Sequence, residues 1–355
     1  MIKHNAILEV NLKNLAFNYK KLSKIANQSI CAATIKADAY GIGVIKTFET
    51  LYKNKCRHFF VATTEEALEI RKKKLLANVY VLNGLESNEL SIFNNTNIIP
   101  IINDKDEYNF VIKKIKQYKK LKFGIHIDTG LNRLGLDIND LLKINSYHNK
   151  IHILLSHLSS ADEGKNNYNI LQNNKFKSAI NLKINAKYNS LSNSMGIILG
   201  NNFHHDLVRP GISLYGGHFN TKMKQIIKPV ICLKGKILQI KEISKNEFVG
   251  YNQTYKTHKK LKVAILGIGY ADGISRVLSN KGNAYFKNKT FKIIGRVSMD
   301  SITVDISKND KLIKVGDYME IINHSNGIDK IANQCNTICD EILTSISKRV
   351  KRVYI

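Results

Sequence analysis

The chain of 355 residues is long enough for one large domain or two smaller ones, and its 43% hydrophobic share suits a globular protein with a substantial core. No stretch reaches the roughly 18 consecutive apolar residues of a membrane span, so we expect no membrane partner. The formal net charge of +27 is typical of nucleic-acid-binding proteins, but the lysines are scattered among many asparagines and isoleucines. Because no RNA-binding motif and no basic tail accompany them, a compositional bias is the simpler explanation, and we expect no nucleic-acid partner.

The N-terminus and the cysteines indicate the cellular compartment of the protein. Residues 1–5 lack the apolar core of a signal peptide, which predicts a cytoplasmic protein. The five cysteines are odd in number and form no C-x-x-C pair, which indicates reduced thiols and no metal site. Cys335 and Cys339 fall on the apolar face of a helix predicted over 328–345, where we expect them to pack in the core.

The first predicted elements are a strand over 6–10, a helix over 12–25 and a short buried strand over 30–35. This buried strand ends on Lys36, which is followed by the turn-forming sequence Asp-Ala-Tyr-Gly. The carboxyl ends of strands carry the chemistry in barrels of alternating strands and helices, and burial there lowers the pKa of a lysine, which makes it a usable nucleophile or base. A lysine at a strand end can equally lay its stem on apolar surface with its amino group in water.

Eight short apolar runs alternate with helix-like segments in the first part of the chain. They lie near Cys31, Phe59, Val79, Ile98, Phe123, Ile153, Asn189 and Leu207. Helix start signals separate them, such as Thr63 with Glu66 and Asp104 with Glu107. Eight strand–helix units predict a closed (β/α)8 TIM-type barrel over 11–225. The rival, an open doubly wound sheet, is disfavoured because no G-x-G-x-x-G sequence follows the first strand.

From about residue 228 strand-like runs follow one another. These runs cover 229–243, 262–268, 291–306 and 318–322, and the only clear helix is the one over 328–345. We therefore predict a mainly β domain over 226–355, to which the strand in residues 1–10 is added.

Several side chains at predicted strand ends suit the binding of an anionic ligand. Arg133 lies between two glycines after the fifth run, where a fixed guanidinium would bind a carboxylate or a phenolate, although a surface turn has the same pattern. Phosphate sites in barrels use the loops after strands seven and eight. Asn193 and Ser194 follow the seventh run, and Gly211, which allows close backbone approach, follows the eighth.

Five segments together resemble the alanine racemase family of pyridoxal-phosphate enzymes, which are built on a barrel plus a β domain. They are K-A-D-A-Y-G at 36–41, D-T-G-L-N-R-L-G at 128–135, V-R-P-G-I at 208–212, G-Y-A-D-G at 269–273 and G-R-V-S-M-D at 295–300. The resemblance extends from Ala6 to the C-terminus.

The resemblance implies roles for residues of the barrel. Lys36 would carry pyridoxal 5'-phosphate as a Schiff base, and His157, otherwise a common core histidine, would pack on the pyridine ring. Arg133 would contact the phenolic oxygen of the cofactor and the carboxylate of the substrate. The phosphate would be bound by Tyr40, Asn193, Ser194, Gly211 and Ile212.

Arg209 matches the family arginine that donates a hydrogen bond to the pyridine nitrogen. Because an arginine does not give up its proton in proteins, the ring nitrogen would stay unprotonated. The carbanion would then be less delocalised, which favours return of a proton to Cα over transamination or decarboxylation.

The β domain supplies the remaining implied residues. Tyr251 would be a catalytic base, while Tyr270, Met299 and Asp300 would bind the substrate; as isolated residues, such tyrosines are usually packing residues. In the family these residues come from the neighbouring subunit, so the resemblance implies a homodimer with shared active sites. L-alanine and D-alanine would be interconverted by two bases, Lys36 on the D-alanine face and the partner's Tyr251 on the L-alanine face.

Three positions depart from the family pattern. His126 stands where many members have a lysine that is often carbamylated, so we expect no carbamate beside Arg133. Ile42 replaces a common histidine, and Lys348 stands where some members have a tyrosine on the phosphate side. Two alternatives remain: a broad-specificity amino-acid racemase on the same fold, and a protein that binds the cofactor without turnover. The sequence does not distinguish a role in cell-wall synthesis from a role in catabolism.

Overall fold

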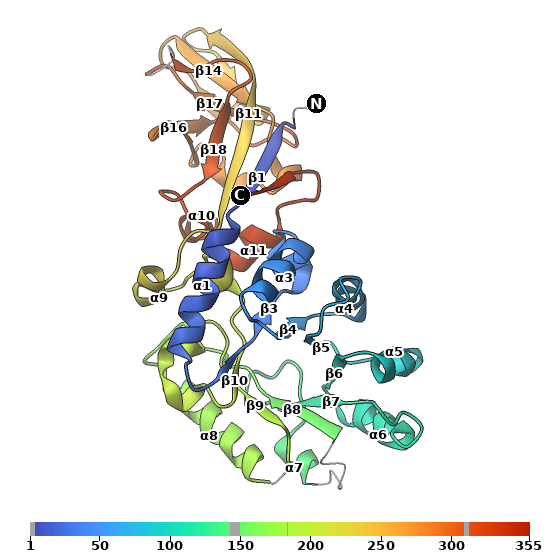
Figure 1. Cartoon of the computed structure of the whole chain (residues 1–355). Coiled ribbons are helices and arrows are strands. Elements are labelled where there is room, and N and C mark those ends of the chain that lie inside the picture. The colour runs from blue at the N-terminus through green and yellow to red at the C-terminus, as the bar shows by residue number, and fades with distance from the viewer. Residues whose placement is uncertain (1–3, 143–149, 183, 309–311) are drawn as a thin grey trace.

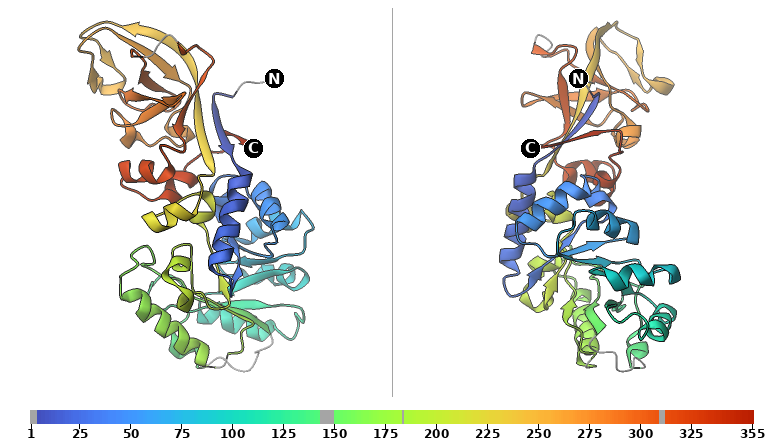
Figure 2. Two further views of the ribbon diagram at one scale, coloured as in Figure 1. Left: turned by 60° about the vertical axis from the view of Figure 1, so that its left-hand side comes forward. Right: turned by 45° about the vertical axis from the view of Figure 1, so that its right-hand side comes forward.

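The computed structural model describes residues 4–142, 150–182, 184–308 and 312–355. It has two lobes, which stand one above the other in Figure 1 and remain distinct in both views of Figure 2. The lower lobe alternates strands and helices, and the upper lobe is mainly β-strands. Residues 1–3, which are predicted to belong to the β domain, lie outside the described residues.

The lower lobe is a parallel barrel. Its first strand is split into β2 (Ile30–Cys31) and β3 (Ala33–Thr34), and the others are β4 (His58–Val61), β5 (Asn78–Val81), β6 (Ile98–Ile102), β7 (Phe123–His126), β8 (Ile151–Leu155), β9 (Tyr188–Ser190) and β10 (Leu207–Val208). Strands β3 to β9 pair in chain order, and β10 pairs with β2. Two backbone hydrogen bonds of 2.9 Å close the ring, from the Ala32 N–H to the Val208 oxygen and from the Arg209 N–H to the Ser192 oxygen. The eight predicted runs and the barrel are thus confirmed.

Helices cover the outside of this barrel. They are α1 (Leu12–Ile25), α3 (Val44–Lys53), α4 (Thr64–Arg71), α5 (Leu90–Asn95), α6 (Lys105–Lys114), α7 (Ile138–Leu141), α8 (Tyr168–Asn181) and α9 (Thr221–Ile226). Two of the predicted start signals cap their helices, because the side chains of Thr63 and Asp104 accept hydrogen bonds from the N–H groups of Glu66 and Glu107. Among the described residues, no helix has the length and apolar character needed to cross a bilayer.

The upper lobe is built around the long strand β11 (Ile231–Ile243). The other strands are β12 (Phe248–Val249), β13 (Tyr255–Lys256), β14 (Leu261–Leu266), β15 (Asn283–Phe286), β16 (Lys289–Ile294), β17 (Ile302–Asp305), β18 (Tyr318–Ile322) and β19 (Lys351–Tyr354). The sheet runs β14-β17-β16-β15-β18-β11-β1-β19, and a further pairing between β14 and β11 closes part of it into a β-barrel. The N-terminal strand β1 (Ala6–Val10) pairs with β11 and β19, so both ends of the described chain belong to this lobe (Figure 1).

Two predictions for this lobe were wrong in detail. The predicted helix over 328–345 is two helices, α10 (Ile328–Gln334) and α11 (Cys339–Thr344), because Asn336 adopts a left-handed φ of 54° that interrupts the α-helix. As a result Cys339 is buried, whereas Cys335 is only half-buried. The predicted run over 291–306 is likewise divided, into β16 and β17.

Helix α11 reaches down from the upper lobe onto the barrel (Figure 1). A Cβ atom on Gly41, whose φ is +81°, would lie 2.7 Å from the backbone oxygen of Leu343 in this helix. Only glycine permits this approach without strain. The close contact brings the start of α11 to the carboxyl ends of the barrel strands, next to the segment that follows β3.

Candidate active site

One cavity of about 570 Å³ at the carboxyl ends of the barrel strands contains most of the predicted site residues. Lys36 follows β3, Arg133 follows β7 and His157 follows β8, while other lining residues come from the segments after β9 and β10. The predicted residues that line it are Lys36, Tyr40, Arg133, His157, Asn193, Ser194, Arg209, Gly211 and Ile212. These nine residues come from five separate segments of sequence, which the barrel topology brings together at one end.

Lys36 begins an unusual turn, the segment α2 (Lys36–Tyr40). The four residues after it, Ala37 to Tyr40, all have φ between 53° and 55°, a left-handed conformation that costs roughly 1–2 kcal/mol for each non-glycine residue. The surroundings hold the turn in place, because Glu66 Oε1 accepts a hydrogen bond of 2.6 Å from the Ala37 N–H and Asp38 Oδ1 accepts one of 2.7 Å from the Val44 N–H. Strain of this kind persists where a precise side-chain position is needed.

The two departures near this turn lie away from the cavity. The buried Ile42 packs in the core, and its carbonyl oxygen accepts a hydrogen bond of 3.1 Å from the hydroxyl of Tyr354 on β19. Lys348 is exposed and lines a separate hollow with Asp38 and Arg352. Neither side chain is among those that line the cavity around Lys36.

The hydroxyl groups of Tyr40 and Ser194 face the segment after β10. Ser194 Oγ accepts hydrogen bonds from the backbone N–H groups of Gly211 at 2.9 Å and Ser213 at 3.3 Å. A Cβ atom on Gly211 would lie 2.4 Å from the Tyr40 hydroxyl oxygen, so glycine leaves this approach open. Asn193 Oδ1 accepts hydrogen bonds from the N–H groups of Met195 at 3.1 Å and Gly196 at 2.9 Å, which fixes the loop after β9.

Arg209 is a buried cation that binds only neutral groups. Its Nη1 donates a hydrogen bond to Ser190 Oγ, and its Nη2 donates one of 2.5 Å to the backbone oxygen of Ser156. Among the described residues no carboxylate forms an ion pair with it. Burial lowers the pKa of Arg209 to about 10, so the guanidinium keeps its charge at neutral pH.

Two imidazoles lie near the cationic groups of the cavity. His126 Nδ1 is 3.0 Å from Asn103 Oδ1, and burial, with the charges of Arg209 and Arg133, lowers the pKa of His126 to about 4. Burial and the same two arginines hold the pKa of His157 well below its ordinary value. Both rings are therefore neutral near pH 7, and burial together with Arg133 also lowers the pKa of Lys36.

The cavity also holds Asp340, the second residue of α11, which sequence reasoning missed. Nothing in its local pattern distinguishes it from an acidic residue in the first turn of a surface helix. Only the approach of α11 to Gly41 places it at the barrel mouth, and a pattern along the chain does not contain that contact.

The four predicted residues of the β domain do not line this cavity. Tyr251, Tyr270 and Met299 are 68%, 42% and 52% exposed, which is unusual for large apolar side chains. Asp300 accepts a hydrogen bond of 2.6 Å from Arg349 Nη2, and Arg349 Nε lies 2.9 Å from the buried Asp272. Within a single chain, the barrel residues and the β-domain residues thus form two separate groups.

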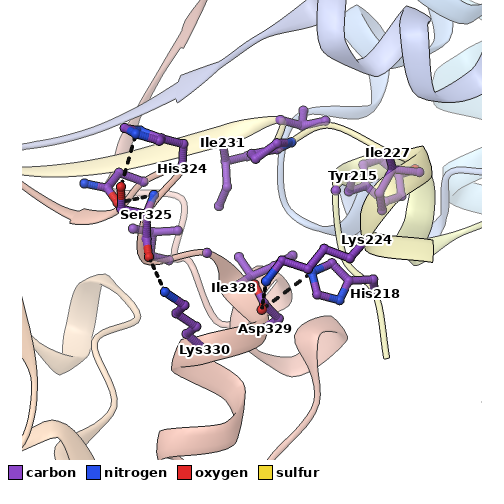
Figure 3. Close-up of a pocket in the computed structure, with 16 residues that line it drawn as sticks. Tyr215, His218, Lys224, Ile227, Ile231, His324, Ser325, Ile328, Asp329 and Lys330 are labelled. Atoms are coloured by element: carbon purple, nitrogen blue, oxygen red, sulfur yellow. Dashed lines mark hydrogen bonds and ion pairs between the residues drawn. The ribbon is translucent and has the colours of Figure 1, made fainter. Parts of the chain in front are cut away.

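A second cavity, of about 490 Å³, lies between α9, β11 and α10 (Figure 3). Asp329 lies 3.5 Å from His218 Nε2 and 4.0 Å from Lys224 Nζ there, so its charge is already compensated. Lys330 donates a hydrogen bond of 2.6 Å to the backbone oxygen of Ser325 on the opposite side. None of the predicted site residues lines this cavity.

The protein belongs to a class of two-domain barrel enzymes. This class is defined by a closed parallel barrel with a lysine after its first strand, joined to a β-barrel lobe. Family models narrow this class: the model of the alanine racemase N-terminal domain matches residues 10–218, and that of the alanine racemase C-terminal domain matches residues 230–354. The chain belongs to the alanine racemase family, a family of isomerases.

Individual relatives agree with this assignment. The chain is 36% identical to the alanine racemase of Rickettsia canadensis over 359 residues, which cover 98% of both chains. It is 36% identical to the alanine racemase of Brucella suis over 370 residues, which cover 98% of this chain and 93% of that one. A crystal structure of alanine racemase from Bartonella henselae with covalently bound pyridoxal phosphate superposes with a TM-score of 0.92, at 36% identity, over 99% of this chain and 100% of that chain.

Proposed function

We propose that this protein interconverts L-alanine and D-alanine, with pyridoxal 5'-phosphate bound in the barrel cavity and attached to Lys36. The observation that carries the proposal is that one cavity contains both a lysine held on a strained turn and a buried arginine, for which the described residues provide no carboxylate partner. The relatives' names indicate alanine as the substrate, and the Bartonella henselae structure has this cofactor bound covalently.

The residues of the cavity fit this cofactor. A pyridine nitrogen without a proton is a neutral acceptor, and Arg209 is a buried donor whose other contacts, Ser190 and Ser156, are also neutral. A phosphate needs hydroxyl and backbone donors, and the Tyr40 hydroxyl, Ser194 and the backbone at Gly211 and Ile212 lie close together in the cavity.

In this proposal Lys36 holds the cofactor, Arg209 binds its ring nitrogen and His157 packs on the ring. Tyr40, Asn193, Ser194, Gly211 and Ile212 surround the phosphate, and Arg133 binds the substrate carboxylate. When bound, the cofactor supplies an electron sink that makes the Cα proton of an amino acid acidic.

The protein's own groups then move this proton. Lys36 Nζ accepts or returns it on one face of Cα, and burial assists by lowering the pKa of this amine. We infer that the partner subunit's Tyr251 acts on the opposite face. Arg209, which keeps its own proton, limits the spread of negative charge into the ring, so that return of the proton to Cα is favoured.

We further infer that residues 11–225 form the cofactor-binding domain and that residues 226–355, with 1–10, complete the active site of a second copy. The support is the exposure of Tyr251, Tyr270 and Met299, which a partner's barrel mouth would cover together with Asp300. We keep the cytoplasm as the proposed location, since the five cysteines are free thiols, as is usual in a reducing compartment.

The test is a racemisation assay of the purified protein with a panel that includes alanine, serine, lysine and arginine. We expect alanine to be the preferred substrate, whereas comparable rates for the others would indicate a broad-specificity racemase. Borohydride reduction followed by peptide mapping should locate the reduced cofactor on Lys36. Cofactor found on another lysine, or bound without turnover of any amino acid, would overturn the proposal.

A further inference from the structure

Asp340 is the only carboxylate among the described residues that line the cavity around Lys36. The charged residues with which it shares the lining are Lys36, Arg133 and Arg209. A single acidic side chain among several cations that line the same cavity calls for a chemical explanation.

The carboxylate of Asp340 makes no hydrogen bond or ion pair with any other described residue. Its backbone, in contrast, is fixed: its carbonyl oxygen accepts a hydrogen bond of 2.9 Å from Thr344 Oγ1 within α11, and this helix packs against Gly41. The side chain is therefore presented to the cavity from a rigid support, with its oxygens available to a ligand.

Electrostatics relate this carboxylate to Lys36. Burial raises the pKa of Asp340, while a hydrogen bond from its own backbone N–H and the positive charge of Lys36 act in the opposite direction. A carboxylate whose pKa is raised is a better proton acceptor than an exposed one. The other titratable groups around it are Tyr40 on the lysine turn, Cys339 on its own helix, and Arg133, His126, His157 and Arg209 in the cavity.

The chemistry of the substrate supplies a role for this group. At neutral pH an amino acid is a zwitterion whose nitrogen is an ammonium group, which has no lone pair and cannot attack a carbon atom. To react, this nitrogen must lose a proton and then take the place of Lys36 Nζ on the cofactor. It must therefore come to the position of Nζ, inside the cavity in which Asp340 is the only carboxylate among the described lining residues.

We propose that Asp340 is a further catalytic residue, which attracts the ammonium group of the incoming substrate and accepts one of its protons before the nitrogen displaces Lys36. One N–H bond of the substrate breaks, one O–H bond forms on the carboxylate, and the nitrogen keeps the electron pair. The proton then leaves to water through the mouth of the cavity. This inference rests on the proposed function, because it assumes a cofactor on Lys36.

The test compares two amines that react with the cofactor-loaded protein at neutral pH, followed by stopped-flow absorbance. L-alanine arrives as an ammonium ion, whereas hydroxylamine is already neutral and has no proton to lose before it attacks. In Asp340→Asn we expect the displacement of Lys36 by alanine to slow roughly 100-fold, in the range of general acid–base effects, while hydroxylamine reacts at an unchanged rate. The defect toward alanine should shrink at alkaline pH, where the substrate amine is neutral.

Two variants control for charge and folding. Glu341→Gln removes the neighbouring exposed carboxylate, which bonds to Thr337 outside the cavity, and should leave both reactions unchanged. Asp340→Glu keeps a carboxylate and should retain part of the alanine rate, which keeps the proposal testable if Asp340→Asn fails to fold. Equal slowing of both amines, or no slowing of either, would overturn this role. A protein without cofactor absorbance would instead refute the proposed function itself.

Discussion

Arg352 on β19 donates two hydrogen bonds to the carbonyl oxygen of Gly41, from Nε at 3.1 Å and from Nη2 at 2.7 Å. The same guanidinium also donates to the backbone oxygens of Ile346 at 2.7 Å, Ser347 at 2.5 Å and Val350 at 2.8 Å. A single side chain near the C-terminus therefore ties the left-handed turn after Lys36 to the segment that follows α11.

Removal of this side chain should destabilise the protein and loosen the lysine turn. In Arg352→Ala the carbonyl oxygens lose charged donors, so we expect the free energy of unfolding to fall by roughly 3 kcal/mol. Urea denaturation followed by circular dichroism measures this loss. Lys351→Ala, at an exposed position of the same strand, is the matched control and should change stability little. Equal effects of the two substitutions would contradict the role given to Arg352.

The environment of Arg133 predicts an enzyme that does not respond to bicarbonate. His126 is neutral near pH 7 and is held by Asn103, so the position of the family lysine holds no amine that could form a carbamate. Racemase activity should be the same with and without added bicarbonate, whereas His126→Lys, if it folds, should gain a dependence on it. Bicarbonate activation of the unchanged protein would refute this prediction.

Replacement of Arg209 by glutamate should slow racemisation and allow side reactions. A carboxylate would hold a proton on the ring nitrogen of the cofactor and so lengthen the life of the carbanion. We expect a slower racemisation, together with a new long-wavelength absorbance or a slow transamination that yields pyruvate. Arg209→Gln, which cannot accept that proton, should lose activity without the side reaction. Wild-type behaviour of the glutamate variant would show that Arg209 does not control the ring nitrogen.

Subunit mixing tests whether active sites are shared. Lys36→Ala and Tyr251→Phe should each be nearly inactive, but a dimer of the two has one site with intact copies of both residues. With random exchange half of the dimers are mixed and each has one intact site of two, so roughly one quarter of wild-type activity should return. If both bases came from one chain, mixing would restore nothing, provided that exchange is shown independently.

Acid should destabilise the barrel through two buried histidines at its other end. His58 Nδ1 and His152 Nδ1 lie 2.8 Å and 3.2 Å from the Tyr80 hydroxyl, and burial lowers both pKa values from about 6.5 to about 4. Between these values the unfolded chain binds more protons than the folded one, so the free energy of unfolding should fall as the pH drops from 6.5 to 4. Denaturation of His58→Asn across this window should show a shallower slope, and an unchanged slope would contradict the assignment.

Much of the fold could be predicted because its signals are local. Each barrel strand is a short apolar run, and helix caps such as Thr63 and Asp104 mark the segments between them. The break at Asn336 was missed because apolar residues continue at helical spacing on both sides of it, so the pattern does not reveal a single left-handed residue.

The candidate site was predictable where the resemblance supplied motifs and unpredictable where the fold brings distant segments together. Six of the nine cavity residues of the barrel come from the matched motifs, while His157, Asn193 and Ser194 were predicted from their places after apolar runs together with the resemblance, and the structure groups all nine. Asp340 belongs to no such motif and lies 304 positions after Lys36, as their numbers show. The position of Asp340 in the cavity depends on the contact between α11 and Gly41. This contact joins the two lobes and cannot be predicted from the spacing of residues along the chain.

The pairing of β1 with β11 and β19 affects the order in which the two lobes fold during synthesis. Ala6 leaves the ribosome before its partner Gly235, which follows only after the whole barrel, and Lys351, the partner of Ile7, follows later still. Contacts between such distant residues are slow to form because a long loop must close first. The barrel can assemble while β1 is still unpaired, so the upper lobe folds after it, and a nascent chain exposes an unpaired strand edge until β11 and β19 have been made.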